Sequence, residues 1–176
     1  MIIEYSLGVQ DFLNFQLYLA SKSARINKKR GRSWFMIILA SILAAIYFYF
    51  IEIKVLSIYC FLVAILTFLF YPKYYKRKLK KHYQTHIVEN YANRIGEPIE
   101  MEFADDFLFA KDKTGESKTK ISEINIVNET LHYFFVNMST GVSFIIPKDI
   151  LDDKQALKSK FIDLGLSINE ELEWKW

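Results

Sequence analysis

Two long apolar runs dominate the hydrophobic pattern of the chain. Residues 34–51 and 55–71 contain no Asp, Glu, Lys, Arg or His, and three residues separate them. At a rise of about 1.5 Å per residue, helices of 18 and 17 residues extend nearly across a hydrocarbon core of about 30 Å. Because so short a connection forces the helices to be antiparallel neighbours, the pattern predicts a transmembrane helical hairpin over 34–71.

Small side chains recur at helical spacing within both runs, and they allow close approach of membrane helices. We therefore expect a contact seam formed by Ser57, Cys60, Ala64 and Thr67 of the second run with Ala40, Ser41, Ala44 and Ala45 of the first.

The segment before the hairpin predicts a short strand over 2–7 and a helix from Val9 to about Arg32. No helix breaker precedes Gly31, so this helix is expected to run close to Trp34 or directly into the membrane. It can lie on the membrane surface or pack on the C-terminal part of the chain, and its apolar face without Lys or Arg favours packing. More than thirty largely polar residues precede the first apolar run, so we expect no cleavable signal peptide.

The segment after the hairpin predicts a basic helix over 72–96 that continues the second membrane helix and ends at Gly96. His82 and His86 share one face of this helix, a spacing that can hold zinc. Since Glu89 is the only carboxylate within a turn, we interpret them as surface side chains and predict no metal or other cofactor.

From residue 97 the pattern alternates with a period of two, which is typical of strands with one buried face. Turn residues separate the strands, including Ala104-Asp105-Asp106 and Thr140-Gly141. In the second strand Phe107 and Phe109 are expected to point inward. The predicted strands are 99–103, 107–112, 117–128, 131–139 and 142–147.

A short amphipathic helix follows the strands. Asp152 is the predicted N-cap, with Gln155 three residues later, and Gly165 is the predicted C-terminal stop. Ala156, Leu157, Phe161 and Leu164 form its apolar face. For the tail beyond it, with Trp174 and Trp176, membrane anchoring and docking on the domain are equally open.

Together these elements predict an α+β membrane protein: a two-helix hairpin and a cytoplasmic antiparallel β-meander capped by a C-terminal helix. The pleckstrin-homology type of fold has this layout, and other small α+β folds share the order. The predicted divisions are an N-terminal strand and helix (1–33), the hairpin (34–71), the basic juxtamembrane helix (72–96) and the β-rich domain (97–176).

The net charge of +3 hides a strong segregation. Residues 22–32 and 73–81 each carry six Lys or Arg and no acid, whereas residues 82–176 carry 10 basic and 17 acidic residues. A nucleic-acid-binding interpretation of the basic pI therefore fails. Because positive flanks remain on the cytoplasmic side, we expect a multi-pass protein of the plasma membrane with both termini cytoplasmic.

The basic flanks are also candidate contacts to the anionic lipid leaflet, where each cation contributes on the order of 1 kcal/mol. Topology alone is a sufficient explanation for them. The candidate contacts are Lys28, Lys29, Arg30, Lys73, Lys76, Arg77, Lys78, Lys80 and Lys81.

Five stretches together resemble the YcxB-like family of bacterial membrane proteins. The resemblance implies a soluble part similar to bacterial pleckstrin-homology-like domains, and it brings no catalytic or ligand-binding residues. The stretches are DFLNFQLYLASKS (11–23), PKYYKRKLKKHY (72–83), RIGEPIEMEF (94–103), TGESKTKISEI (114–124) and TGVSFIIPK (140–148).

These features favour a non-catalytic, membrane-anchored binding or scaffold module, whose partner is a protein segment, a lipid headgroup or another copy of the chain. Addition of a strand to a sheet edge is one available mode. A transport or channel subunit is the alternative, although two runs without ionisable groups argue against it. A membrane enzyme is less favoured because hydrolase, metalloprotease and phosphate-loop motifs are absent.

Overall fold

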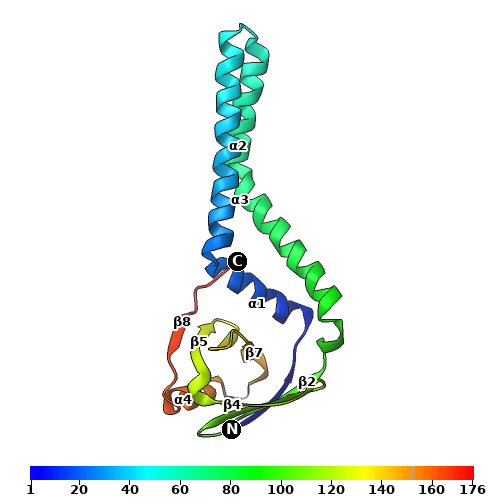
Figure 1. Cartoon of the computed structure of the whole chain (residues 1–176), viewed down its shortest axis with the longest axis vertical. Helices are drawn as coiled ribbons and strands as arrows, with labels where there is room; N and C mark the ends of the chain where they lie inside the picture. Colours follow the sequence, from blue (N-terminus) through cyan, green and yellow to red (C-terminus); the bar gives the residue numbers. More distant parts are fainter. Residues whose placement is uncertain (152) are drawn as a thin grey trace. The chain divides into compact units, whose positions relative to one another are not determined.

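The computed structural model describes residues 1–151 and 153–176 (Figure 1). These residues form two compact units. Residues 1–15 and 85–175 form a unit called here the β-domain, and residues 16–84 with Trp176 form the helical unit. The helices are α1 (Val9–Lys22), α2 (Ala24–Phe50), α3 (Lys54–Asn90) and α4 (Lys154–Asp163), with 3₁₀ turns η1 (Ala92–Arg94), η2 (Ile121–Glu123) and η3 (Lys148–Ile150). The strands are β1 (Ile2–Ser6), β2 (Pro98–Phe103), β3 (Phe107–Asp112), β4 (Gly115–Lys120), β5 (Ile124–Thr130), β6 (Tyr133–Met138), β7 (Ser143–Pro147) and β8 (Ile168–Glu171).

Within the helical unit, α2 and the first half of α3 run side by side (Figure 1). Ser57 Oγ donates a hydrogen bond to the Ala45 carbonyl at 2.7 Å, and the rings of Trp34 and Phe68 lie 5.3 Å apart. Ala45 and Ala64 are buried. The predicted seam is therefore present, with the exception of Ala40, which is exposed.

Both helices of the hairpin expose their apolar side chains. Each contains an 18-residue window of high hydropathy in which only 6% of the residues are buried. A core helix of a soluble protein would bury most of such a window. The two helices are thus long and apolar enough to cross a membrane.

The predicted helix from Val9 to Arg32 is divided in the structure. It breaks at Ser23, whose extended backbone and side-chain oxygen cap α2 by accepting a hydrogen bond from the Ile26 amide at 3.3 Å. Gly31 lies inside α2. The expectation of one unbroken helix from Val9 to Arg32 was wrong, because Ser23 interrupts it as the N-cap of a second helix.

The basic segment continues the second apolar helix, as predicted. Pro72 lies inside α3, where its missing N–H removes one helical hydrogen bond. The helix ends at Asn90, six residues before Gly96, and η1 connects the two. Gly96 takes a φ of +79°, so it ends the turn that follows the helix.

The first sheet of the β-domain is antiparallel with strand order β1-β2-β3-β4. The predicted N-terminal strand forms its edge by pairing with β2. The predicted orientation of β3 was wrong: Leu108 is buried, whereas Phe109 is exposed on the opposite face. Pairing places Leu108 opposite Phe103, so the inward face of β2 determines which side of β3 is buried.

The second sheet has strand order β7-β6-β5-β8. The predicted single strand 117–128 is split between the sheets, with η2 separating β4 from β5. Ile121 and Ile124 are both buried, and a spacing of three residues fits a 3₁₀ turn better than a strand. β6 and β7 form the predicted hairpin, in which Gly141 takes a φ of +84°.

Helix α4 fills the space between the two sheets. Phe161 contacts Phe103 of the first sheet and Phe134 of the second, with ring centroids 5.3 and 5.5 Å away. The side chain of Asp153 caps this helix, and the predicted cap Asp152 lies outside the described residues. Burying one aromatic ring against both sheets joins them in one core.

The hydrophobic pattern of the sequence did not predict the C-terminal strand β8. It pairs parallel to β5, with Asn128 opposite Asn169, so the second sheet is not purely antiparallel. Its sequence INEE lacks the apolar alternation that identifies strands.

The N-terminal half of α1 packs on the second sheet. The rings of Phe15 and Phe135 lie 5.2 Å apart, and Tyr133 Oη donates a hydrogen bond to Asp11 at 2.8 Å. Burial raises the pKa of Tyr133, and the contact with Asp11 contributes in the same direction, to about 12. Of the two interpretations of this helix, packing on the C-terminal part is the one observed for residues 9–15.

Candidate functional site

An open groove of about 430 Å³ lies in the β-domain, and we call it the β7 groove. Its apolar lining comes from strands and a helix far apart in the chain, including Tyr5, Phe12 and Ile99. Residues 142–145 at the start of β7 line it as well. The groove therefore exists only because β1, β2 and the β6–β7 hairpin fold together.

The rim of the β7 groove carries charged side chains whose net charge is zero. Three cations and three carboxylates occupy it, and each cation pairs with one carboxylate at 2.6 to 2.8 Å. Hydrogen bonds from Thr114 and Arg94 lower the pKa of Asp112 to about 2, so this carboxylate stays charged at all ordinary pH values. The pairs are Arg94–Asp112, Lys111–Glu116 and Lys113–Glu97.

Strand β7 is an edge of its sheet and borders the groove. The Met138 amide donates to the Val142 carbonyl at 2.9 Å, and bonded and non-bonded pairs alternate along an antiparallel ladder. Phe144 and Ile146 therefore direct their main-chain groups to β6. Ser143 and Ile145 direct theirs away from β6, and Ile145 is buried there.

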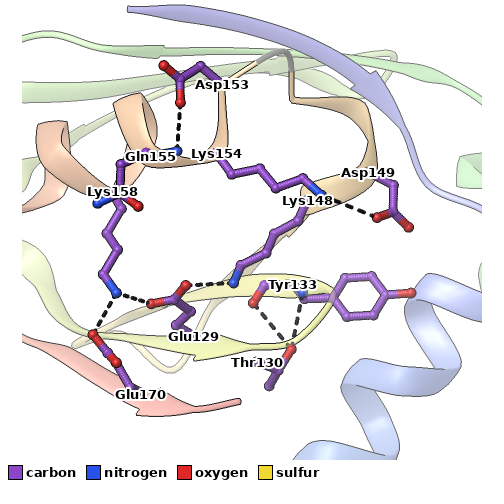
Figure 2. Close-up of polar contacts among 10 residues, drawn as sticks. All are labelled: Glu129, Thr130, Tyr133, Lys148, Asp149, Asp153, Lys154, Gln155, Lys158 and Glu170. Atoms are coloured by element: carbon purple, nitrogen blue, oxygen red, sulfur yellow. Dashed lines mark hydrogen bonds and ion pairs between the residues drawn. The ribbon is translucent and has the colours of Figure 1, made fainter.

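A buried ionic cluster lies beneath α4 (Figure 2). Glu129 of β5 is only 5% exposed, and it contacts Lys148 Nζ at 2.6 Å and Lys158 Nζ at 2.8 Å. Lys158 also reaches Glu170 of β8 at 2.6 Å. Burial opposes ionisation of Glu129, but the two lysines outweigh it and hold its pKa below the ordinary value.

The cluster links four segments from the second half of the chain: β5, η3, α4 and β8. Next to it, Thr130 Oγ1 accepts a hydrogen bond from the Tyr133 amide at 3.1 Å, and Asp153 accepts one from the Gln155 amide at 2.8 Å (Figure 2). Since each charged side chain of the cluster has an ion-pair partner, we interpret the cluster as a clamp on the C-terminal segment.

The basic residues predicted as lipid contacts lie in the helical unit, on the first turns of α2 and on α3 beyond its apolar half. All are exposed except Arg30, which is half-buried. Lys76 Nζ lies 5.5 Å from the centre of a Trp176 ring. These residues belong to a different unit from the β7 groove and the ionic cluster, neither of which was predicted from the sequence.

The predicted pair of surface histidines is exposed. The His86 ring contacts the Asn90 side chain at 3.0 Å, and the His82 ring lies 5.8 Å from that of Tyr83. Among residues 1–151 and 153–176, no group of three or more His, Cys, Asp or Glu side chains has the geometry to hold a metal ion.

Residues 103–161 match the family described as YcxB-like protein. This segment is similar to that family. No curated protein matches the chain.

The YcxB-like segment runs from the end of β2 into α4. It includes β7, the 110–117 wall of the groove, and three of the four clamp residues: Glu129, Lys148 and Lys158. The family match therefore covers part of the groove and most of the clamp, whereas Tyr5, Phe12 and Ile99 of the groove and the whole hairpin lie outside it.

Proposed function

We propose that this chain is a non-catalytic binding or scaffold module that the α2–α3 hairpin anchors in a membrane. The proposal rests on the different exposure of apolar side chains in the two units. The hairpin exposes its large apolar side chains, while the β-domain buries its own in a separate core. An apolar surface of this extent requires lipid or another apolar partner.

Charge supports a defined orientation. The helical unit carries 13 basic residues and 1 acidic residue, net +12, and the β-domain carries 10 basic and 19 acidic residues, net −9. Positive flanks stay on the cytoplasmic side. Both termini and the β-domain are then cytoplasmic, and the connection around residues 51–53 faces outward from the plasma membrane.

The same charge distribution favours lipid contact by the helical unit. The exposed lysines of α2 and α3 attract an anionic leaflet, whereas the acidic β-domain is repelled by it. The β-domain is thus the part that recognises a protein partner. Two sheets joined by one C-terminal helix support a pleckstrin-homology-like layout for this domain, with the parallel β8 as an addition.

Extraction of native membranes tests whether the α2–α3 hairpin is inserted in the bilayer. We expect the full chain to stay in the membrane pellet at alkaline pH and in high salt, and to be released only by detergent. Release by salt alone would contradict a spanning hairpin, because salt screens surface charge and leaves apolar insertion intact.

Cross-linking of the full chain in native membranes tests the binding role. We expect linked peptides from a second protein on the β-domain. Links confined to copies of this chain would favour a structural oligomer. Links mainly between hairpins of several chains would favour a transport or channel assembly.

A further inference from the structure

We infer that the indole ring of Trp176 lies in the cytoplasmic headgroup layer of the membrane beside Lys76. The segment after β8 then makes a membrane contact of its own, separate from the hairpin, and its partner is the phospholipid surface. This inference rests on the proposed function, because the depth of Lys76 follows from an inserted hairpin. It selects membrane anchoring over docking on the β-domain as the interpretation of the tail.

The tail divides between the two units. Residues up to Lys175 belong to the β-domain, whereas Trp176 belongs to the helical unit. The Trp174 amide donates a hydrogen bond to the Glu171 carbonyl at 3.0 Å, in the turn that follows β8. The ring of Trp176 instead lies 5.5 Å from Lys76 Nζ, and this residue is half-buried. Trp176 is therefore part of the surface of the helical unit.

The position of Lys76 along α3 determines its depth. The second apolar run ends at Tyr71, five residues before Lys76, and five residues of helix rise by about 7.5 Å. The second half of α3 departs from α2 (Figure 1), so the rise along the hairpin axis is smaller than this. The headgroup layer on each side of a bilayer is roughly 5–7 Å thick. Lys76 therefore lies at the level of the headgroups when the hairpin spans the bilayer.

The surroundings of Lys76 in α3 are typical of a membrane interface. The ring of Tyr71 lies 6.4 and 6.1 Å from the rings of Tyr74 and Tyr75, and Tyr74 is 58% exposed. Glu52, in the connection at the opposite end of the hairpin, is the only acid among residues 16–84. Trp and Tyr are enriched at this depth because the ring contacts apolar chains while its N–H or O–H reaches polar groups.

The pair of Lys76 and Trp176 matches both chemistries of a phospholipid surface. The ring contacts acyl chains, and the ammonium group of Lys76 has three N–H donors, so it can bind phosphate oxygens while it also contacts the ring. Glu170, Glu171 and Glu173 precede Trp176, and an anionic leaflet repels these carboxylates. The contact is therefore confined to the ring of Trp176.

Fluorescence of single-tryptophan variants of the full chain tests the inference in vesicles of phosphatidylcholine and phosphatidylglycerol. Trp34→Phe/Trp174→Phe retains Trp176, and Trp34→Phe/Trp176→Phe retains Trp174. Lipids brominated at the headgroup end of the acyl chain quench a ring in the headgroup layer, and lipids brominated at the methyl end do not reach it. We expect the shallow bromines to quench Trp176 at least about twofold more strongly than Trp174, and the deep bromines to quench neither.

Two lysine variants test the cation. Lys76→Gln should lower the shallow quenching of Trp176 by about two- to fivefold, the range of an exposed cation–π contact. Lys78→Gln removes the same charge from the other side of the helix and should leave the quenching unchanged. Lys76→Arg should retain it, because a guanidinium also binds the ring face. Circular dichroism in the same vesicles establishes that each variant is folded.

No shallow quenching of Trp176, equal quenching of Trp174 and Trp176, or an equal effect of Lys76→Gln and Lys78→Gln would each overturn the inference. Trp174→Phe/Trp176→Phe, which retains Trp34 at the start of the first apolar run, judges the proposed function separately. Quenching of Trp34 without quenching of Trp176 would reject the tail contact and leave the hairpin inserted. Quenching of neither ring would reject both.

Discussion

The ionisation state of Glu129 affects the packing of several segments of the β-domain. Glu129 is buried, and both of its oxygens face lysine side chains from different segments. Removing one member of a buried ion pair leaves an uncompensated charge, which costs more than the pair contributes. The clamp therefore makes the position of α4 and β8 depend on four side chains.

Glu129→Gln should lower the free energy of unfolding of the β-domain by about 3–5 kcal/mol at neutral pH, because Lys148 remains buried without its counter-charge. The measurement is amide hydrogen exchange of β6 in the full chain. The double variant Glu129→Leu/Lys148→Met is the control, and it should recover most of the loss.

The pH dependence gives a second readout of the same variant. The folded-state pKa of Glu129 lies below its ordinary value, so its stabilisation is present above the ordinary pKa and is lost as the pH falls through the folded-state value. The stability gap between wild type and Glu129→Gln should therefore shrink on acidification. A constant gap would show that the charge of Glu129 is not what stabilises the clamp.

At the scale of elements, pairing register decides which side chains are buried. β3 reads FLFAKD, and its two phenylalanines are the stronger hydrophobic signal. They lie on the outer face, where Lys118 Nζ covers them at 4.0 and 5.0 Å from the ring centres of Phe107 and Phe109. The burial of Leu108 follows from its partner Phe103, a neighbour that the local pattern of β3 does not contain.

Leu108→Ala should destabilise the β-domain by about 2–5 kcal/mol, the usual effect of truncating a buried leucine. Phe109→Ala, although it removes a larger side chain, should cost about 1 kcal/mol or less, since that ring is partly exposed and its contacts are a cation–π contact with Lys118 and a ring contact with Phe107. Thermal unfolding of the two variants in micelles compares them directly. The reverse order of stability would contradict the observed register.

At the scale of the whole molecule, opposite charges are segregated into two units, net +12 in the helical unit and net −9 in the β-domain. This segregation matters for topology because only basic residues close to the spans influence it. The basic residues of the β-domain, by contrast, mostly pair with neighbouring acids.

Replacing the six basic residues of 73–81 with glutamine should produce a mixed population of orientations. The measurement is labelling of a cysteine introduced at Ile53, in a Cys60→Ser background, by a reagent that does not cross membranes. The wild-type orientation gives labelling from outside only, and the variant should lose part of it. Replacing Lys111, Lys113, Lys118 and Lys120 with glutamine is the matched control, and labelling should not change.

The amino-acid sequence by itself determined the elements whose signal is local. The apolar runs, the small-residue seam and the basic flanks can be read from consecutive residues, and so can the β6–β7 hairpin with Gly141. Each depends on neighbours within a few turns or one hairpin. The nine basic candidates for lipid contact were found in the same way.

Only the tertiary structure decided what depends on residues far apart in the chain. The β7 groove brings Tyr5 together with Ile99 and Ile145, and the clamp joins Glu129 to Lys158 and Glu170. The split of 117–128 between two sheets and the parallel pairing of β8 have the same origin. These features depend on burial and on strand pairing. A local pattern of hydrophobic or charged residues does not predict which distant segment a strand or side chain will contact.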